Sequence, residues 1–483
     1  MSYAQIEELS SRYKVVPVSR EIYADVVTPI GLLSKISRIS NRYYLLESVE
    51  GGEKWGRYSF LGFDPIVHIS CRRNEITVEE EGTPRTFHCD HPYAFLRRFR
   101  SDYSGPRLAS LPPFTGGLVG YFSYNMIEYT EPSLDLRPSE FDDFALMLFD
   151  KAIVYDHMRQ KISVIANIRT HDLQGNYRKA MDDMDDIVST ITRYAPLPEP
   201  NAGRVLSFGC NVSEEEYKAM ILETKKRIES GGIFQAVISR RFEAEYHNSL
   251  INAYRVLRTT NPSPYMVYLQ DKDVQIMSTS PETLVRLKDG VLTTFPIAGS
   301  RPRGENLEED GLLEKEMLED EKELSEHNML VDLARNDLAK VCKCSTVEVK
   351  NYKHVQRYSK VMHIASEVQG QIEDGKDAFD VLQAVIPAGT VSGAPKVKAC
   401  QIIEEIERDP RGIYGGAIGY IDFTGNMDMS IGIRMAVRKD GKVYVQSGSG
   451  IVADSIPENE CEESKKKAEA VLEAIVLGEE VGF

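Results

Sequence analysis

The clearest pattern of apolar positions lies near the middle of the chain. Ser213 and Glu216 have the spacing of a capping box, which marks the start of a helix. Apolar and small residues then recur at helical spacing until Gly231 and Gly232, at positions 217, 220, 221, 224 and 228. The pattern predicts a helix between the capping box and the two glycines.

Other segments of the second half show either strand-like or helix-like spacing. Runs of β-branched and aromatic residues predict strands at residues 233–242, 265–269, 275–279, 416–422, 428–437 and 442–447. Helical spacing of apolar residues predicts helices at residues 314–335, 378–385, 396–406 and 459–477.

The first half is dominated by short β-type runs separated by turns. These runs predict strands at residues 42–48, 57–63, 66–71, 75–78 and 162–168, and a helix at 176–193 closes this half. A stretch rich in Pro and Gly, residues 195–204, is interpreted as a linker. The chain is therefore divided into an N-terminal region, 1–200, and a second domain, 205–483. The order of elements favours a β-rich α+β protein over a regular βαβ alternation.

Composition narrows the class of protein. The 483 residues carry 58 Lys and Arg against 74 Asp and Glu, a formal charge of −16, which argues against a nucleic-acid or anionic membrane surface. The seven cysteines are an odd number scattered along the chain, which is typical of reduced thiols. No run approaches a membrane span, and the first residues lack a signal-peptide core. We therefore expect a soluble, cytoplasmic protein.

Common nucleotide and hydrolase motifs are absent. The glycine-rich segment 389–396 does not have P-loop spacing, and the segment 414–420 lacks the first half of a dinucleotide fingerprint. The sequence contains neither HExxH nor GxSxG, and Cys342 and Cys344 have no partner pair at zinc-finger spacing.

Pairs of glutamates form the main candidate for chemistry. Glu323 and Glu326 are three residues apart in a predicted helix, and Glu460 and Glu463 repeat this spacing. Two such helix faces could supply oxygen ligands to Mg²⁺. Solvated acidic faces are the alternative, because the segment 305–326 is rich in acids. His363, in a mixed apolar run, is by itself compatible with a buried structural role.

Several longer motifs resemble the chorismate-utilising enzymes. They are PIAGSRPRG at 296–304, ELSEH at 323–327, VDLARND at 331–337, PAGTVSGAPK at 387–396 and GSG at 448–450. In the first half, LLES at 45–48 and RYS at 57–59 resemble the N-terminal region of anthranilate synthase component I. The resemblance implies an α+β fold in which large β-sheets pack as a sandwich with helices outside and two interleaved subdomains.

Two positions distinguish members of the family. Water-using members carry a lysine base at the position of Gln235, and a neutral amide cannot deprotonate water, so ammonia is favoured as the nucleophile. Members that add the amino group at C4 have a nucleophilic lysine where this chain has Ala298. Both positions indicate the anthranilate synthase reaction, which converts chorismate and ammonia to anthranilate and pyruvate. An aminodeoxychorismate or aminodeoxyisochorismate synthase is the alternative.

The resemblance also implies roles for individual residues. Glu282 would act as general acid, and His363, with Thr390 nearby, as the base that removes the C2 proton. Glu326 and Glu463 would hold Mg²⁺, with Glu323 and Glu460 as further ligands or supports. Chorismate would be bound by Gly299, Ser300, Tyr414, Arg434, Gly448, Ser449, Gly450 and Lys467.

A regulatory site and a partner are implied as well. Two segments resemble a tryptophan feedback site: Leu46, Glu47 and Ser48 with Pro264, Tyr265 and Met266. The two regions account for nearly the whole length, and no Gly-x-Cys-x-Gly elbow is present. Use of glutamine would therefore require a separate amidotransferase subunit. A non-catalytic subunit that senses tryptophan remains an alternative of a different class.

Overall fold

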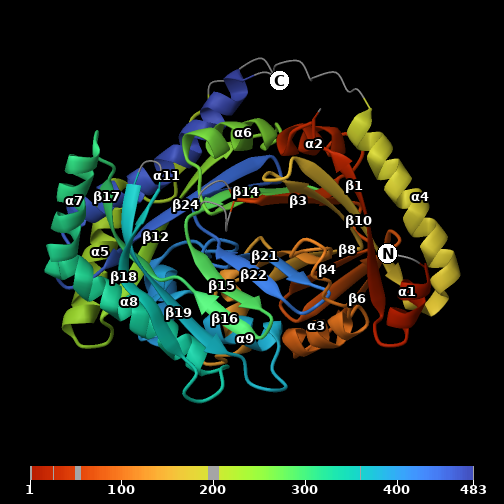
Figure 1. The fold of residues 1–483 in the computed structure, drawn as a ribbon. Coiled ribbons are helices and arrows are strands. Elements are labelled where there is room, and N and C mark those ends of the chain that lie inside the picture. The colour runs from red at the N-terminus through yellow and green to blue at the C-terminus, as the bar shows by residue number, and fades with distance from the viewer. Residues whose placement is uncertain (1–2, 26, 49–55, 194–205, 359–360, 482–483) are drawn as a thin grey trace.

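Two large antiparallel β-sheets face each other and form the centre of the molecule. The computed structural model describes residues 3–25, 27–48, 56–193, 206–358 and 361–481. Within these residues each sheet contains twelve strands, and helices cover the outer faces (Figure 1). The α+β sandwich expected from the sequence is confirmed.

The first sheet combines strands from both halves of the chain. Its N-terminal and C-terminal parts meet where β2 pairs with β13. The strand order is β1 (Val15–Tyr23), β10 (Lys161–Arg169), β9 (Lys151–Asp156), β3 (Tyr58–Phe63), β2 (Arg42–Glu47), β13 (Tyr265–Asp271), β14 (Val274–Ser280), β23 (Met435–Lys439), β24 (Lys442–Ile451), β12 (Gln235–Glu245) and β11 (Gly209–Cys210), with β20 (Gly393–Ala394) beside β12.

The second sheet is mixed in the same way, and its two halves meet where β7 pairs with β21. The strand order is β17 (Ile297–Pro302), β19 (Val361–Gln371), β16 (Val291–Thr294), β15 (Thr283–Lys288), β22 (Met427–Ile431), β21 (Ala417–Asp422), β7 (Gly117–Phe122), β8 (Phe144–Phe149), β4 (Val67–Arg72), β5 (Glu75–Glu80) and β6 (Thr83–His88), with β18 (Glu348–Arg357) beside β19. Because both sheets draw strands from both sides of residues 195–204, the two regions are interleaved.

The helices are distributed over the two outer faces and one end of the sandwich. On the first sheet lie α2 (Pro29–Ile36), α4 (Leu173–Thr192), α6 (Ile251–Thr260) and α11 (Pro457–Glu480), and on the second lie α3 (Pro92–Ser101) and α9 (Ala378–Val385) (Figure 1). The remaining helices are α1 (Tyr3–Ser10), α5 (Glu214–Glu229), α7 (Leu307–Glu319), α8 (Glu321–Ala339) and α10 (Lys396–Ile406). The capping box predicted for α5 is present, since Ser213 and Glu216 each accept a backbone hydrogen bond from the other.

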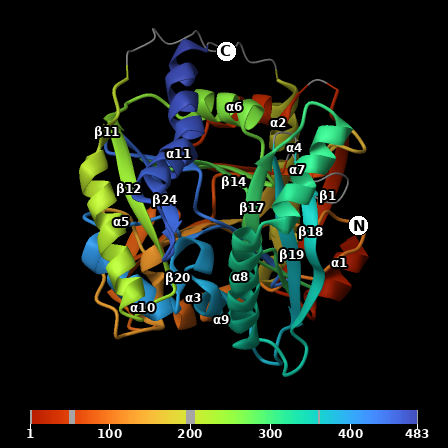
Figure 2. The same ribbon diagram turned by 90° about the vertical axis from the view of Figure 1, so that its left-hand side faces the viewer.

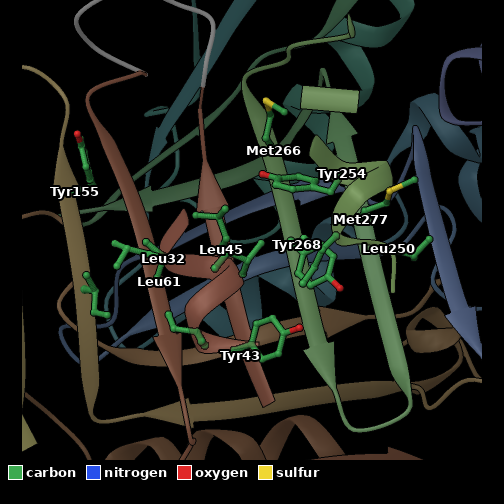
Figure 3. Packing of buried hydrophobic residues seen from close by; sticks show 14 of the residues in the cluster. Leu32, Tyr43, Leu45, Leu61, Tyr155, Leu250, Tyr254, Met266, Tyr268 and Met277 are labelled. Carbon is green, nitrogen blue, oxygen red and sulfur yellow. The ribbon is translucent and has the colours of Figure 1, made fainter. Parts of the chain in front are cut away.

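Strand β2 shows how the layers are built. Its side chains alternate between faces: Tyr43 and Leu45 pack under the outer helices (Figure 3), whereas Tyr44 and Leu46 pack between the sheets. All four are buried. A strand covered on both faces is apolar throughout, which explains the unbroken hydrophobic run in the sequence.

The helix predicted at residues 314–335 is two helices in the structure. Asp320 adopts an extended conformation that ends α7, and its carboxylate accepts hydrogen bonds from the N–H groups of Lys322 and Glu323 to begin α8. An aspartate favours this N-cap position because its side chain satisfies backbone donors that the helix leaves open.

The strand predicted at residues 428–437 is also two elements, β22 and β23, which belong to different sheets. The chain passes between the sheets at Gly432, Ile433 and Arg434, and Arg434 has a positive φ of 49°. This prediction was wrong because apolar residues continue through the crossing.

Three further predictions concern the chain as a whole. The predicted linker, 195–204, lies outside the described residues. All seven cysteines are described, and all are free thiols. Among the described helices, none combines the length and the apolar composition that spanning a membrane would need.

Candidate active site

A cavity of about 930 Å³ lies between one edge of each sheet. Its walls come from β12 and β24 of the first sheet and from β17 and β19 of the second. Helices α8 and α11 and the short 3₁₀ helix η4 (Gly389–Val391) complete it. Figure 2 shows the end of the molecule at which these elements meet.

The structure brings together nearly all of the catalytic, chorismate-binding and metal-binding residues that the sequence predicted. The following line the cavity: Glu282, Gly299, Ser300, Glu323, Glu326, His363, Thr390, Tyr414, Arg434, Gly448, Gly450, Glu460, Glu463 and Lys467. Ser449 is the exception, because its side chain is fully buried with its Oγ 3.4 Å from the hydroxyl of Tyr217. Only its backbone remains available for the predicted role.

Glu282 is the most perturbed acid in the cavity. Burial raises the pKa of its carboxyl to about 7, although Thr390 and Lys467 act in the opposite direction by favouring the charged form. Near neutral pH this carboxyl is therefore partly protonated, as a general acid must be.

His363 is oriented by the strand beside it. Its Nδ1 lies 3.0 Å from the carbonyl oxygen of Gly299 and 2.8 Å from Oγ of Ser300. Since a carbonyl can only accept, Nδ1 carries the proton and the lone pair is on Nε2. Gly299 has a φ of +64° at a bulge in β17, a conformation that favours glycine. The backbone thus sets the tautomer of a potential base.

The four glutamates come from two helices, α8 and α11. The pKa of Glu326 is raised mainly by burial, and the nearby charges of Glu323 and Glu463 raise it further. Closely spaced carboxylates of this kind fit a hard divalent cation such as Mg²⁺. Among the described residues no three such side chains are within reach of one ion. Water and an anionic group of the substrate would therefore have to supply the remaining ligands of a cation held here.

Three of these four carboxylates have a hydrogen-bond or ion-pair partner in the structure. Glu463 accepts from Nζ of Lys467 at 2.6 Å, and Glu460 accepts from Oγ of Ser455 at 2.8 Å. Glu323 lies 3.4 Å from Nη1 of Arg301. A cation bound here would compete with these contacts.

Two positive groups, Arg434 and Lys467, lie in the cavity beside Glu463 of α11. Arg434 is held by a hydrogen bond from its Nη1 to the carbonyl oxygen of Lys467, 2.8 Å long. Lys467 also donates to the carbonyl oxygen of Gly448 at 3.2 Å. Together with Tyr414, these residues form a surface suited to carboxylate groups.

Gln235 is buried in β12, and its Oε1 has no hydrogen-bond partner among the residues that the structure describes. The side chain lines the cavity, as does Ala298 on the facing strand β17. Gln235 thus offers a neutral hydrogen-bond acceptor to the cavity, and neither Gln235 nor Ala298 carries an ammonium group.

Sequence reasoning missed several residues of the cavity wall. Lys322 and Lys466 line the cavity next to the predicted glutamates and Lys467, and Gln446 and Ser447 precede the predicted glycines. These four residues could have been found from the sequence because each lies within two positions of a predicted site residue.

A second cavity, of about 190 Å³, lies between the sheets and contains all six predicted tryptophan-site residues. They come from β2 and β13 and the residues next to these strands, whereas β15, β21 and β22 supply the facing wall. The carboxylate of Glu47 is already engaged: it accepts from Tyr254 at 2.9 Å and from Arg258 at 3.0 Å. These two partners pair the charge of Glu47 within the protein, and its role in tryptophan binding stays a prediction.

Comparison with known proteins identifies the family. The sequence pattern of the chorismate binding enzymes matches residues 41–473. The chain belongs to this family.

Within this family, the chain is similar over its full length to proteins named anthranilate synthase component 1. Anthranilate synthase component 1 of Acetivibrio thermocellus is 43% identical, with 98% of this chain and 99% of that protein covered. The protein of the same name from Aquifex aeolicus is 42% identical, with 99% and 98% covered. The crystal structure of anthranilate synthase component I from Streptococcus pneumoniae has a TM-score of 0.77 and 33% identity, covering 94% of this chain and 99% of that one. A menaquinone-specific isochorismate synthase from Escherichia coli shares the fold, with a TM-score of 0.70 at 18% identity.

The raised pKa of Glu282 predicts a pH-dependent stability difference. Below about pH 4.5 the carboxyl is protonated in both folded and unfolded chains, whereas above about pH 7 the folded chain must hold a buried charge. Relative to wild type, Glu282→Gln should therefore gain stability as the pH rises through this window, by up to ~3 kcal/mol. Urea denaturation at several pH values measures the difference. Glu8→Gln, an exposed change on α1, is the control, and a constant offset for Glu282→Gln would contradict the assignment.

Proposed function

We propose that this chain converts chorismate and ammonia to anthranilate and pyruvate, as component 1 of an anthranilate synthase. The observation that carries the proposal is one cavity holding Glu282 with a pKa of about 7, His363 with a fixed tautomer, and Gln235 in place of a lysine base. The full-length relatives named anthranilate synthase component 1 support the same reaction.

The first step is an amination. Ammonia forms a bond to C2 of chorismate as the C4–O bond breaks, and Glu282 protonates the departing hydroxyl so that it leaves as water. The product is aminodeoxyisochorismate. Gln235 favours ammonia because a neutral amide cannot deprotonate a water molecule, and Ala298 cannot form the covalent intermediate that a lysine would.

The second step is an elimination. His363 removes the C2 proton through Nε2, the C3–O bond breaks as the ring becomes aromatic, and the enolpyruvate that leaves is protonated on carbon to give pyruvate. The hydroxyl of Thr390 lies beside Glu282, where it favours the charged carboxylate that remains after the first step. Arg434, Tyr414 and Lys467 would hold the substrate carboxylates during both steps.

Mg²⁺ is the proposed cofactor, held by Glu326 and Glu463 with Glu323 and Glu460 beside them. When bound, the ion would neutralise the ring carboxylate and orient the ring. The support is the donor set: carboxylates from α8 and α11 line one cavity, and the charges of Glu323 and Glu463 help to raise the pKa of Glu326, which favours a cation there.

We infer that ammonia reaches this chain from a glutamine amidotransferase subunit. The name component 1 of the relatives implies a second component, and the elbow motif of such a glutaminase is absent from this sequence. A cytoplasmic location is proposed on the seven free thiols.

The reaction predicts a specific pattern of nucleophile use. With chorismate and Mg²⁺, the isolated chain should form fluorescent anthranilate from ammonium but not from glutamine, and glutamine should become effective when the amidotransferase subunit is added. An accumulating amino-cyclohexadiene without anthranilate would favour an aminodeoxychorismate or aminodeoxyisochorismate synthase. Tryptophan binding without any turnover would favour a sensing subunit.

Replacing the base should separate the two steps. His363→Ala should still aminate chorismate but slow the elimination by about 10²- to 10⁴-fold, so aminodeoxyisochorismate should accumulate and be detectable by chromatography. His91→Ala, an exposed histidine before α3, serves as the control. Normal anthranilate formation by His363→Ala would refute the assignment of the base.

We further propose that the cavity between the sheets binds tryptophan and lowers activity. Its lining combines apolar and aromatic surface with Lys288 and with the ion pair between Arg286 and Asp428, 3.0 Å apart, so that both signs of charge are present, as they are in an amino acid. Tyr265 connects this cavity to the active site, since its hydroxyl accepts from Oγ1 of Thr283, the residue after Glu282, at 3.0 Å.

Filling the cavity should abolish inhibition. Ser48→Phe places a ring in the cavity, so tryptophan binding by calorimetry and inhibition of anthranilate formation should both be lost while turnover without tryptophan persists. Thr86→Phe, on the exposed strand β6, adds the same side chain elsewhere and should change neither. Unchanged inhibition in Ser48→Phe would contradict the proposed site.

A further inference from the structure

Behind the wall of the active-site cavity lies a buried ion pair. Arg411 and Glu407 are each 5% exposed. The guanidinium donates from Nε to Oε2 of Glu407 at 2.9 Å and from Nη2 to Oε1 at 2.6 Å. Glu407 also accepts from the backbone N–H of Ser239 at 2.7 Å and from its hydroxyl at 2.8 Å. Neither charged side chain lines the cavity.

The remaining donors of Arg411 reach main-chain carbonyl groups on two separate elements. Nη2 donates to the carbonyl oxygen of Val237 in β12 at 2.6 Å, and Nη1 donates to that of Val391 in η4. The guanidinium also lies against the rings of Tyr124 and Tyr414, 4.7 and 5.7 Å from their centroids. A planar fork can hold all these groups at once, whereas an ammonium group cannot.

Three of these contacts, Val391, Val237 and Tyr414, lie at or close to residues of the proposed reaction. Val391 follows Thr390, Val237 is two residues beyond Gln235, and Tyr414 itself lines the cavity. The hydroxyl of Ser239 in turn accepts from Nε2 of Gln446, which lines the cavity from β24, at 2.8 Å. The pair thus joins β12, β24, η4 and the loop of Tyr414.

Stability alone is a weak reason for such a pair. Burying two charges carries a large desolvation penalty, and well-packed apolar residues often replace a buried ion pair without loss of stability. The arrangement of contacts, by contrast, depends on the planar guanidinium group. Its N–H donors bind the carbonyl groups of Val237 and Val391, which belong to different elements.

We propose that Arg411 and Glu407 are positioning residues for the reaction: through their contacts they set the spacing of Tyr414, Thr390 and Gln235 around chorismate. The proposal rests on the proposed function. It differs from that function in assigning a role to two residues that touch neither the substrate nor the reacting atoms.

The test compares catalysis with stability in three variants. Arg411→Lys keeps the charge but loses the fork, and we expect kcat/KM for chorismate with saturating ammonium to fall about 10- to 100-fold, with a raised KM. Glu407→Gln keeps an acceptor for Ser239 and should give a smaller loss. The double variant Glu407→Leu/Arg411→Met removes both charges together; its urea midpoint should return toward that of wild type while kcat/KM stays low.

The control is Arg42→Lys, at a similarly enclosed ion pair with Asp271 and Glu79 far along the first sheet. It should leave kcat and KM unchanged. Recovery of kcat/KM together with the urea midpoint in the double variant would overturn the proposal, as would wild-type kinetics in Arg411→Lys. If Arg411→Lys is not recovered folded, Glu407→Gln and the double variant test the proposal by the same two measurements, kcat/KM and the urea midpoint. Absence of anthranilate from wild type would instead refute the proposed function.

Discussion

The arrangement of the active site depends on two neighbouring places where the chain passes from one sheet to the other. One crossing, from β14 to β15, contains Glu282, and another, from β22 to β23, contains Arg434. The two crossings are bonded to each other: Ile431 donates its N–H to the carbonyl oxygen of Glu282 at 3.1 Å, and Thr279 donates to that of Arg434 at 3.0 Å. The proposed acid and a proposed carboxylate-binding residue are thus held by two hydrogen-bonded crossings, residues 281–282 and 432–434, which together are called the joint.

This joint explains the unusual environments of its residues. Glu282 is enclosed because both sheets and η4 surround the crossing, and that burial raises its pKa toward neutrality. Arg434 has a positive φ where the chain turns between the sheets. Backbone strain of this kind persists only where the surroundings fix it, and here the neighbouring crossing provides the fixing hydrogen bonds.

Sequence reasoning captured the elements whose signals are local. The start of α5 follows from Ser213 and Glu216 alone, and the glutamate pairs of α8 and α11 follow from their helical spacing. The order of strands could not be predicted, because pairings such as β2 with β13 join residues more than 200 positions apart. Glu407 and Arg411 were missed because an acid and a base four residues apart resemble an ordinary surface pair.

The same joint connects the two cavities. Tyr265 lines the cavity between the sheets, and its hydroxyl donates to Asp428 at 2.7 Å while accepting from Thr283. Asp428 begins the stretch of β22 that leads to the crossing of Arg434, and Thr283 ends the crossing of Glu282. Under the proposed regulation, a ligand seated between the sheets would act on both crossings through the phenol group of Tyr265. Such a ligand would change activity only to the extent that it binds two arrangements of these crossings with different affinity.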